Sequence, residues 1–322
     1  MLRLNALIVA CVLLALPLTV AAQTYPNKPI KFIIPFPPGG TTDIVGRSIS
    51  DQLGKFLGQT VLIENRGGAA GAIGAEEIAR AAPDGYTIGM ATVSTHGTNP
   101  TTNPKLRYDP VKDFVAITNL ADVPNILAVH PSMKAANAAE FLKLVRARPG
   151  KYSYASSGTG GIGHMFAELF KVSSKTFILH VPYRGAGPAL NDTIGGQVDM
   201  IFDNIPSTLP HVQSGKLVPI AVAAPKRLEI LPNVPTFAEL GFKDANIMAW
   251  YGLVAPAKTP DDVVKKIYDA ALKALATPEV RERFRNAGAT VSGNTPAEYG
   301  KQIQGEMETW RRVVKIQGIK SE

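Results

Sequence analysis

The feature that most restricts the fold of this chain is a pair of glycine-rich turns, one in each half of the sequence. Each follows an apolar stretch of strand length and precedes an amphipathic stretch of helical length, at residues 35–43 and 156–164. A turn of this build brings unpaired backbone N–H groups and the N-terminus of a helix to one point, which favours a negatively charged group. The two turns together predict an anion held between two lobes.

Apolar runs of strand length alternate with amphipathic stretches along the whole chain, which is the pattern of an α/β protein. The first half predicts strands at residues 30–35, 60–65 and 87–93, with helices at 42–57 and 72–81. The pattern restarts after Asn125, with strands at 126–130, 177–183, 198–202 and 218–223, and helices at 137–148, 163–171 and 188–195. A strand at 250–256 leads into three helices that begin at Thr259-Pro260, Thr277-Pro278 and Thr295-Pro296, each with a hydroxyl at the N-cap.

The pattern restarts after Asn125, and the strand and three helices from residue 250 onward are expected to return to the first half. Together these features predict two lobes, each a central sheet flanked by helices. Lobe 1 comprises residues 23–122 and 247–322, and lobe 2 comprises residues 123–246. The hinges are expected near residues 122–125 and 246–250. A glycine cluster at residues 66–71 is interpreted as a close approach of a helix to the sheet.

Residues 1–22 have the build of a Sec signal peptide, with Arg3 before an apolar run and Val20-Ala21-Ala22 at its end. Cleavage is expected after Ala22, which places the mature chain in the periplasm; the apolar run is short for a retained membrane anchor. The only cysteine, Cys11, lies in this segment. The mature chain therefore has no disulfide, no thiolate metal site and no cysteine nucleophile.

The chain carries 34 Lys and Arg against 26 Asp and Glu, a net charge of +8, and loss of Arg3 leaves +7. The basic residues are scattered and are not interleaved with aromatic residues, which argues against nucleic-acid binding. A mild positive potential suits an anionic solute. The five histidines show no paired metal-ligand spacing, so no metal is expected.

The segment Gly158-Thr159-Gly160-Gly161-Ile162-Gly163 also matches the G-x-G-x-x-G fingerprint of dinucleotide-binding folds. The acidic residue expected about twenty positions later is replaced by Tyr183-Arg184, and an arginine there suits a 2′-phosphate. A secreted NADP-dependent oxidoreductase is therefore the alternative. Export and the unexplained first glycine turn argue against it, and no cofactor is expected.

Five further residues are candidates, and all but Asp203 have two interpretations. His164 either donates to an anion from the first turn of its helix or lies on the helix surface, and Asp43 either caps its helix or accepts a hydrogen bond from a ligand. Asp203 lies at a strand end that faces the crevice. Thr95 and His96 follow the strand at 87–93, at the corresponding edge, or have an ordinary loop role.

Six strings of residues, in order along the mature chain, resemble the Bug proteins, the extracytoplasmic solute receptors of tripartite tricarboxylate transporters. They are Tyr25-Pro26-Asn27-Lys28-Pro29-Ile30, Pro35-Phe36-Pro37-Pro38-Gly39-Gly40-x-x-Asp43, Tyr108-Asp109-Pro110-x-x-Asp113-Phe114, Tyr154-Ala155-Ser156-Ser157-Gly158, Val181-Pro182-Tyr183-Arg184-Gly185 and Gly195-Gly196-Gln197-Val198-Asp199.

The resemblance implies a two-lobed type II periplasmic binding protein fold that is not an enzyme, with a small carboxylate in the cleft between the lobes. It also implies a monomer that delivers its ligand to integral-membrane transporter subunits or to a sensor kinase. In such receptors two loops hold one carboxylate through backbone amides, hydroxyls and bridging waters. These loops map to Pro38, Gly39, Gly40, Thr41, Thr42 and Asp43, and to Ser156, Ser157, Gly158, Thr159, Gly160, Gly161 and His164. The distal end of the ligand is expected near Phe36, Thr95, His96, Tyr183 and Asp203.

Overall fold

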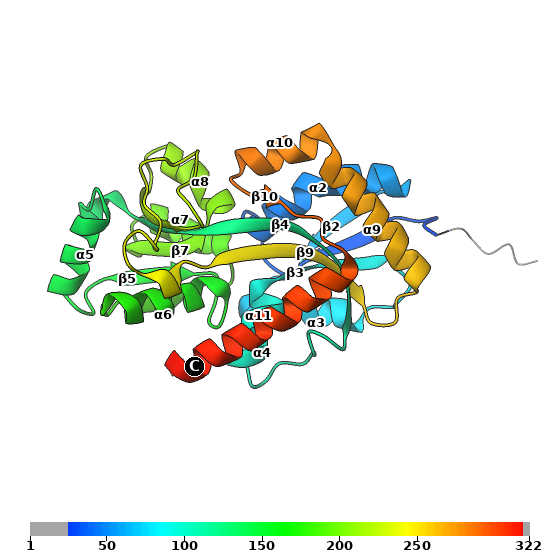
Figure 1. Ribbon diagram of the computed structural model, residues 1–322, viewed down its shortest axis with the longest axis horizontal. Helices are drawn as coiled ribbons and strands as arrows, with labels where there is room; N and C mark the ends of the chain where they lie inside the picture. Colours follow the sequence, from blue (N-terminus) through cyan, green and yellow to red (C-terminus); the bar gives the residue numbers. More distant parts are fainter. Residues whose placement is uncertain (1–24, 318–322) are drawn as a thin grey trace, which may run out of the picture.

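The computed structural model describes residues 25–317 and confirms an α/β architecture (Figure 1). Strands follow one another across the sheet in the order β2-β1-β3-β9-β4-β7-β5-β6, and β8 and β10 both pair with β4. The strands are β1 (Ile30–Ile34), β2 (Val61–Asn65), β3 (Thr87–Thr92), β4 (Phe114–Val129), β5 (Ser153–Ser156), β6 (Leu179–Pro182), β7 (Met200–Asn204), β8 (Val218–Ala223), β9 (Met248–Pro256) and β10 (Thr290–Val291). The helices are α2 (Thr41–Leu57), α3 (Ala72–Arg80), α4 (Asn99–Thr102), α5 (Ala138–Ala147), α6 (Ile162–Ser174), α7 (Ala186–Ile194), α8 (Ile205–Gln213), α9 (Asp261–Ala276), α10 (Pro278–Asn286) and α11 (Pro296–Gln317).

The first half of the sheet is built on parallel pairs of β1 with β2 and β3, followed by antiparallel β9. Parallel strands buried on both faces need nearly continuous apolar sequence, and β1 has it in Ile30-Lys31-Phe32-Ile33-Ile34. Helix α2 approaches this strand closely, because a Cβ atom at Gly46 would lie 2.6 Å from the Cδ1 atom of Ile34. The close approach of α3 to the sheet is made by Gly74, which lies outside the glycine cluster at 66–71: a Cβ atom at Gly74 would lie 2.6 Å from the Cα atom of Pro35, whereas one at Gly67 would lie 2.6 Å from the Cδ atom of Pro37 in the turn after β1.

Strand β4 differs from the expectation that a new strand begins at Ile126. It runs without a break from Phe114 to Val129 and pairs with β9 as far as Pro124↔Met248. From Asn125 onward its partners are β7 and β8. Pro124 has no N–H to donate to a sheet, yet it lies within β4 and is opposite Met248 at the point where β4 changes partners.

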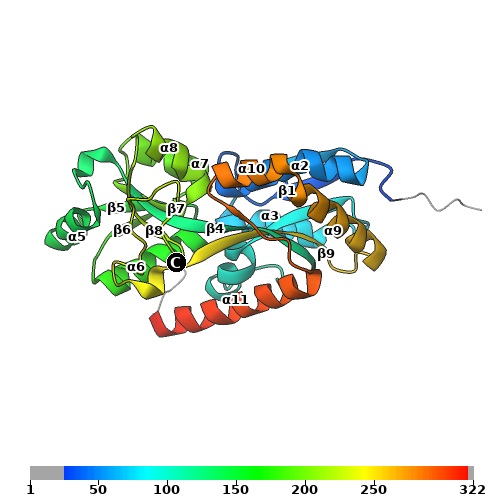
Figure 2. The ribbon, with the colours of Figure 1, turned by 45° about the horizontal axis from the view of Figure 1, so that its top comes forward.

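The C-terminal helices return to the first half of the sheet, as the sequence predicts. Figure 2 shows α11 on one face of the sheet and α2 with α10 on the other. The hydroxyl of Thr277 accepts a hydrogen bond from the Val280 N–H, and Thr295 forms a capping box with Glu298. The predicted cap at Thr259 is wrong, because its hydroxyl donates to the Pro256 carbonyl instead. No helix within residues 25–317 is long and apolar enough to cross a membrane, and the predicted signal peptide lies outside the described residues.

Candidate functional site

A small cavity lies where the first turns of α2 and α6 meet. Its volume is about 20 Å³, which is room for roughly one water molecule. This volume is too small for an organic ligand. The lining residues are Phe36, Gly40, Thr41, Thr42, Thr92, Val93, Ser94, Ser157, Ile162, Ala186, Asp203, Asn204, Ala249 and Tyr251.

The turn between β1 and α2 supplies backbone donors to this cavity. Gly40 is the N-cap of α2 and makes no side-chain capping bond, and the first-turn N–H groups of Thr41 and Thr42 have no acceptor within the helix. The turn is pressed against α7, because a Cβ atom at Gly40 would lie 3.2 Å from that of Ala186. Glycine is therefore the residue that lets the helix end reach the opposite wall.

Asp43 does not line the cavity, so the expected ligand contact is not what the structure shows. Its carboxylate accepts hydrogen bonds from the Gly39 N–H at 3.2 Å, Arg47 Nε at 2.9 Å and Asn65 Nδ2 at 3.0 Å. Burial acts to raise the pKa of Asp43, but the hydrogen bonds from Arg47, Asn65 and Gly39 outweigh it and lower the pKa. The residue orders the turn in which it lies, close to the capping interpretation.

The turn between β5 and α6 supplies the second set of donors. The Ile162 N–H at the start of α6 donates to Ser94 Oγ at 3.0 Å. Ser94 belongs to η2 (Val93–Thr98), a π-helical turn at the end of β3. Its hydroxyl oxygen occupies the position that an anion oxygen takes at such a helix end.

Two glycines of this second turn adopt positive φ angles and contact the first half of the chain. Gly158 has φ of 138° and Gly160 has φ of 78°. A Cβ atom at Gly160 would lie 2.5 Å from Thr102 Oγ1, and one at Gly158 would lie 3.1 Å from the Ala70 nitrogen. Larger residues here would hold the two sides apart.

His164 is buried, so the interpretation as a helix-surface residue is wrong, and it does not line the cavity. Its Nδ1 accepts from the Gly160 N–H at 3.1 Å, and its ring stacks on that of His180 with 4.2 Å between centroids. The Nε2 atom of His180 lies 2.7 Å from Ser156 Oγ. Burial lowers the pKa of His180 to about 3, and the charges of His164 and Lys171 act in the same direction. This pair holds the glycine turn in place.

Asp203 lies in the cavity wall at the end of β7. Its Oδ2 accepts from Ser207 Oγ at 2.6 Å, and Ser207 Oγ lies 2.8 Å from Thr41 Oγ1. A serine hydroxyl has one proton, so the Thr41 hydroxyl is the donor in the second bond. Burial raises the pKa of Asp203 to about 6, although hydrogen bonds from Ser207, Asn204 and Thr208 oppose it. The series of hydrogen bonds from Thr41 through Ser207 to Asp203 joins α2 to β7 across the cavity.

The structure separates the predicted site residues into three groups. Those that line the cavity are Phe36, Gly40, Thr41, Thr42, Ser157 and Asp203. Gly158, Thr159 and Tyr183 instead line a neighbouring pocket of about 480 Å³, together with Lys105 and Arg184. The third group lines neither the cavity nor this pocket: it comprises Asp43, His164, Pro38, Gly39, Thr95, His96, Ser156, Gly160 and Gly161.

Thr95 and His96 are fully buried and do not line this cavity, so their predicted place at the crevice edge stays a prediction. The chain leaves β3 at Thr92 and turns into η2, which directs the His96 ring inward to an edge contact with Phe114 at 4.6 Å. Burial lowers the pKa of His96 to about 3, so this ring is neutral.

Ser94, Asn204 and Tyr251 also line the cavity, although the sequence did not identify them as candidates. The hydroxyl of Tyr251 donates to Asn204 Oδ1 at 2.7 Å. Alternation along the predicted strand at 250–256 is a signal that assigns Tyr251 and Trp250 to opposite faces. Ser94 has no comparable signal, because its position depends on the π-helical turn.

The chain is similar to known solute receptors. The family described as "Tripartite tricarboxylate transporter family receptor" matches residues 45–319. Protein BugT of Bordetella pertussis is 35% identical over 302 residues, which cover 94% of this chain and 93% of BugT.

Solved structures give the same result. A periplasmic transporter is 49% identical, with a TM-score of 0.91 over 92% of this chain and 100% of the other. MatC from Rhodopseudomonas palustris with bound malate is 34% identical, with a TM-score of 0.86 over 90% and 100% of the two chains. A second R. palustris protein, solved with adipate, is 33% identical, with a TM-score of 0.89 over 92% and 99%.

These relatives are binding proteins, which removes the oxidoreductase alternative for the second glycine turn. The chain belongs to the tripartite tricarboxylate transporter receptors, and it is a periplasmic solute-binding protein of the Bug type.

Proposed function

We propose that this receptor binds a small carboxylate between the N-termini of α2 and α6 and closes on it. The observation that carries the proposal is the cavity bounded by both helix ends, with the Ser94 hydroxyl already on the Ile162 N–H. Two helix ends on one anion stabilise it more than either alone. Malate and adipate in the two R. palustris relatives are small dicarboxylates, which supports the same ligand class here.

The proposed motion is a hinge between lobe 1 (residues 23–122 and 247–322) and lobe 2 (residues 123–246). It is supported by β4, which changes partners between Pro124 and Asn125. The neighbouring strand begins at the same level, where Asn125 Nδ2 donates to the Ile247 carbonyl at 2.7 Å. Residues 122–125 and 246–250 therefore bend, and ligand binding shifts the population toward the closed form.

We propose further that the ligand carries a hydroxyl or amino group beside its carboxylate. Asp203 faces the cavity with its carboxylate held only by neutral donors, Ser207, Thr208 and the Asn204 N–H. An ionised Asp203 repels a plain dicarboxylate and accepts a hydrogen bond from an O–H or N–H donor. Malate and aspartate should bind more tightly than succinate, as measured by calorimetry at pH 7.5, whereas equal affinities would contradict this preference.

A substitution in the second turn tests the two-sided site. Gly160→Val should abolish carboxylate binding in isothermal titration calorimetry while the protein stays folded, because the new side chain meets Thr102 and blocks closure. Gly215→Val is the matched control, since Gly215 also has positive φ, at 71°, but has open space around it. Full affinity in a folded Gly160→Val variant would overturn the proposed site.

Export and delivery of the ligand are proposed from membership of the receptor family. We propose that residues 1–22 direct export and are removed after Ala22, and that the mature monomer passes its ligand to integral-membrane transporter subunits or to a sensor kinase. Intact mass measurement of the periplasmic protein tests the first part: a mass beginning at Gln23 is expected, and a retained leader would contradict it. Loss of carboxylate uptake on deletion of the gene distinguishes transport from signalling.

A further inference from the structure

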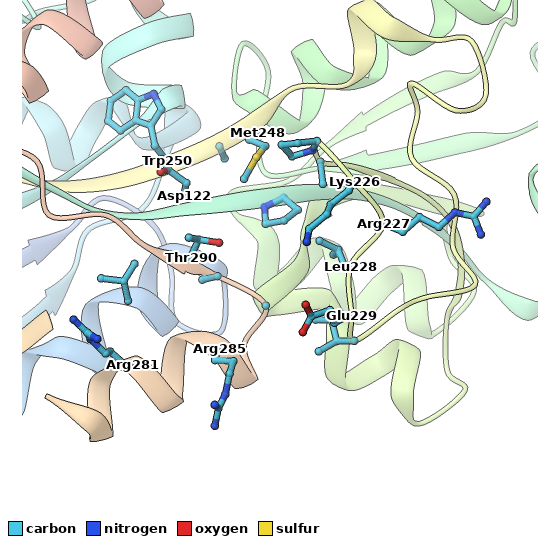
Figure 3. Close-up of a pocket in the computed structure, with 18 of the residues that line it drawn as sticks. Asp122, Lys226, Arg227, Leu228, Glu229, Met248, Trp250, Arg281, Arg285 and Thr290 are labelled. Carbon is cyan, nitrogen blue, oxygen red and sulfur yellow. The ribbon is translucent and has the colours of Figure 1, made fainter. Parts of the chain in front are cut away.

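A second and much larger cavity, of about 910 Å³, lies beside β4 and β9 where these strands pass between the lobes, and Ala249 of β9 lines both this cavity and the one between α2 and α6. Tyr251 lines the small cavity and Trp250 lines the large one, and adjacent residues of a strand point to opposite faces. One wall is formed by residues 224–230, which follow β8, and the other by the end of α10 with residues 288–291 (Figure 3). We call it the hinge cavity.

The interior of the hinge cavity is suited to an apolar body. Met248 and Trp250 of β9 form its floor, and Leu228 and Ile230 belong to the lobe 2 wall. In Figure 3 the Met248 side chain points into the cavity, and Thr290 faces Lys226 and Leu228 across it. The volume lies within the range of small-molecule sites, which are mostly apolar with a few polar groups.

The carboxylates inside the hinge cavity already have hydrogen-bond donors. Asp122 accepts from Asn119 Nδ2 at 2.8 Å. Glu306 accepts from the indole N–H groups of Trp250 at 3.3 Å and Trp310 at 2.6 Å. Burial raises the pKa of both carboxyl groups, which favours their neutral forms and makes a cationic partner less necessary.

The rim of the hinge cavity has an excess of positive charge. Lys226 on the lobe 2 side and Arg281 and Arg285 on the lobe 1 side are all exposed. Arg285 also lies 3.9 Å from the carboxylate of Glu282, and in Figure 3 its side chain extends away from the cavity, so it reaches the rim by a change of rotamer. Arg227 points away from the cavity and forms an ion pair with Glu239 at 2.9 Å. Among the residues that line the cavity, Glu229 is the one exposed carboxylate. A negatively charged head group therefore finds cations on both lobes.

We propose that the hinge cavity binds an organic anion with an apolar body, whose head lies between Lys226 and Arg285 and whose body packs on Trp250 and Met248. Its walls belong to different lobes, so its occupancy is coupled to lobe movement; this coupling rests on the proposed function. Because β4 and β9 lie between the two cavities, closure at α2 and α6 widens the hinge cavity. The occupant thus favours the closed form, and the two ligands raise each other's affinity.

The site is tested with the fluorescent anion 8-anilinonaphthalene-1-sulfonate and the mature protein. Saturable binding is expected in the wild type, with loss of binding in Thr290→Trp, which fills the cavity from an exposed position. Thr309→Trp, on the exposed face of α11, is the matched control and should bind normally. Equal binding by the wild type and Thr290→Trp, or no binding by the wild type, would overturn the site.

The charge requirement has its own variants. Lys226→Glu combined with Arg285→Glu should lower the affinity for the sulfonate probe roughly tenfold, since two solvent-exposed ion pairs are together worth about 1.4 kcal/mol. The neutral probe N-phenyl-1-naphthylamine should bind this double variant as it binds the wild type. Equal weakening of both probes would show that the rim charges do not select an anion.

The coupling is measured between two nitroxide labels on Lys105→Cys and Arg184→Cys, which line one pocket from opposite lobes. The mature chain has no other cysteine. Adding the sulfonate probe should shift the interlabel distances toward the shorter, closed population, and the Thr290→Trp variant should not respond to the probe. Bound probe with unchanged distances would refute the coupling. A carboxylate titration without probe reports separately on the proposed function.

Discussion

Asp43 and Asp203 are two buried carboxylates close to the same cavity, and their surroundings shift their pKa values in opposite directions. Asp43 has a cationic partner, Arg47, and two N–H donors, so its ionised form is favoured. Asp203 has only neutral donors in a buried wall, so its ionised form is disfavoured. One carboxylate stabilises the fold, and the other is available to distinguish ligands.

Asp43→Asn should lower the free energy of unfolding by about 1–2 kcal/mol at pH 7, because the charge-assisted bonds from Arg47 and the turn are weakened. The folded pKa of Asp43 is lowered, so its contribution is present above pH 4 and is lost as the pH falls further. The difference from the wild type in denaturant titrations should therefore shrink in acid. Asp51→Asn, at an exposed position of the same helix, is the control. A loss that is the same at pH 7 and pH 3 would argue against this role.

Asp203→Asn should have the opposite effect. The folded pKa of Asp203 is raised to about 6, so the wild type loses stability as the pH rises from about 4 to 6. The variant escapes this loss and should be more stable than the wild type at pH 7.5 by up to about 3 kcal/mol, with little gain at pH 4. It should also lose the preference for malate over succinate. A variant that is equally destabilised at both pH values would contradict the assignment.

At the scale of elements, the cavity depends on three turns: the ends of β1 and β5 and the π-helical turn η2 after β3. The two glycine turns were recognisable in the sequence because glycine, proline and hydroxyl residues cluster between a strand and a helix. The turn η2 was not, since nothing in Val93-Ser94-Thr95-His96 distinguishes a π-helical turn from a loop. This difference explains why the sequence predicts Thr41 and Ser157, which line the cavity, but does not predict Ser94.

Ser94→Ala tests whether the η2 hydroxyl competes with the ligand for the Ile162 N–H. The ligand would no longer displace this hydroxyl, so carboxylate affinity should rise about threefold to tenfold, as expected for one hydrogen bond. The unliganded protein should melt at a lower temperature. Ser132→Ala, at an exposed position away from the cavity, is the control. A fall in affinity would mean that Ser94 binds the ligand directly.

At the scale of the whole molecule, β4 and β9 carry both halves of the sheet and separate the two cavities. The sequence predicts the alternation of strands and helices and the return of the C-terminal helices, because each depends on local patterns. It does not predict that one strand serves both halves. That outcome depends on pairing with β7, β8 and β9, which lie far away in the sequence.

The most direct test of the central claim is the thermal unfolding midpoint of the mature protein with a panel of small carboxylates, with NADP and neutral sugars as controls. A ligand at 100 times its Kd should stabilise the folded state by roughly 2.7 kcal/mol, which is a readily measured shift. The account predicts such a shift with a hydroxy or amino dicarboxylate, and its disappearance in Gly160→Val but not in Gly215→Val. A shift with NADP alone, or a carboxylate shift that Gly160→Val retains in full, would contradict it.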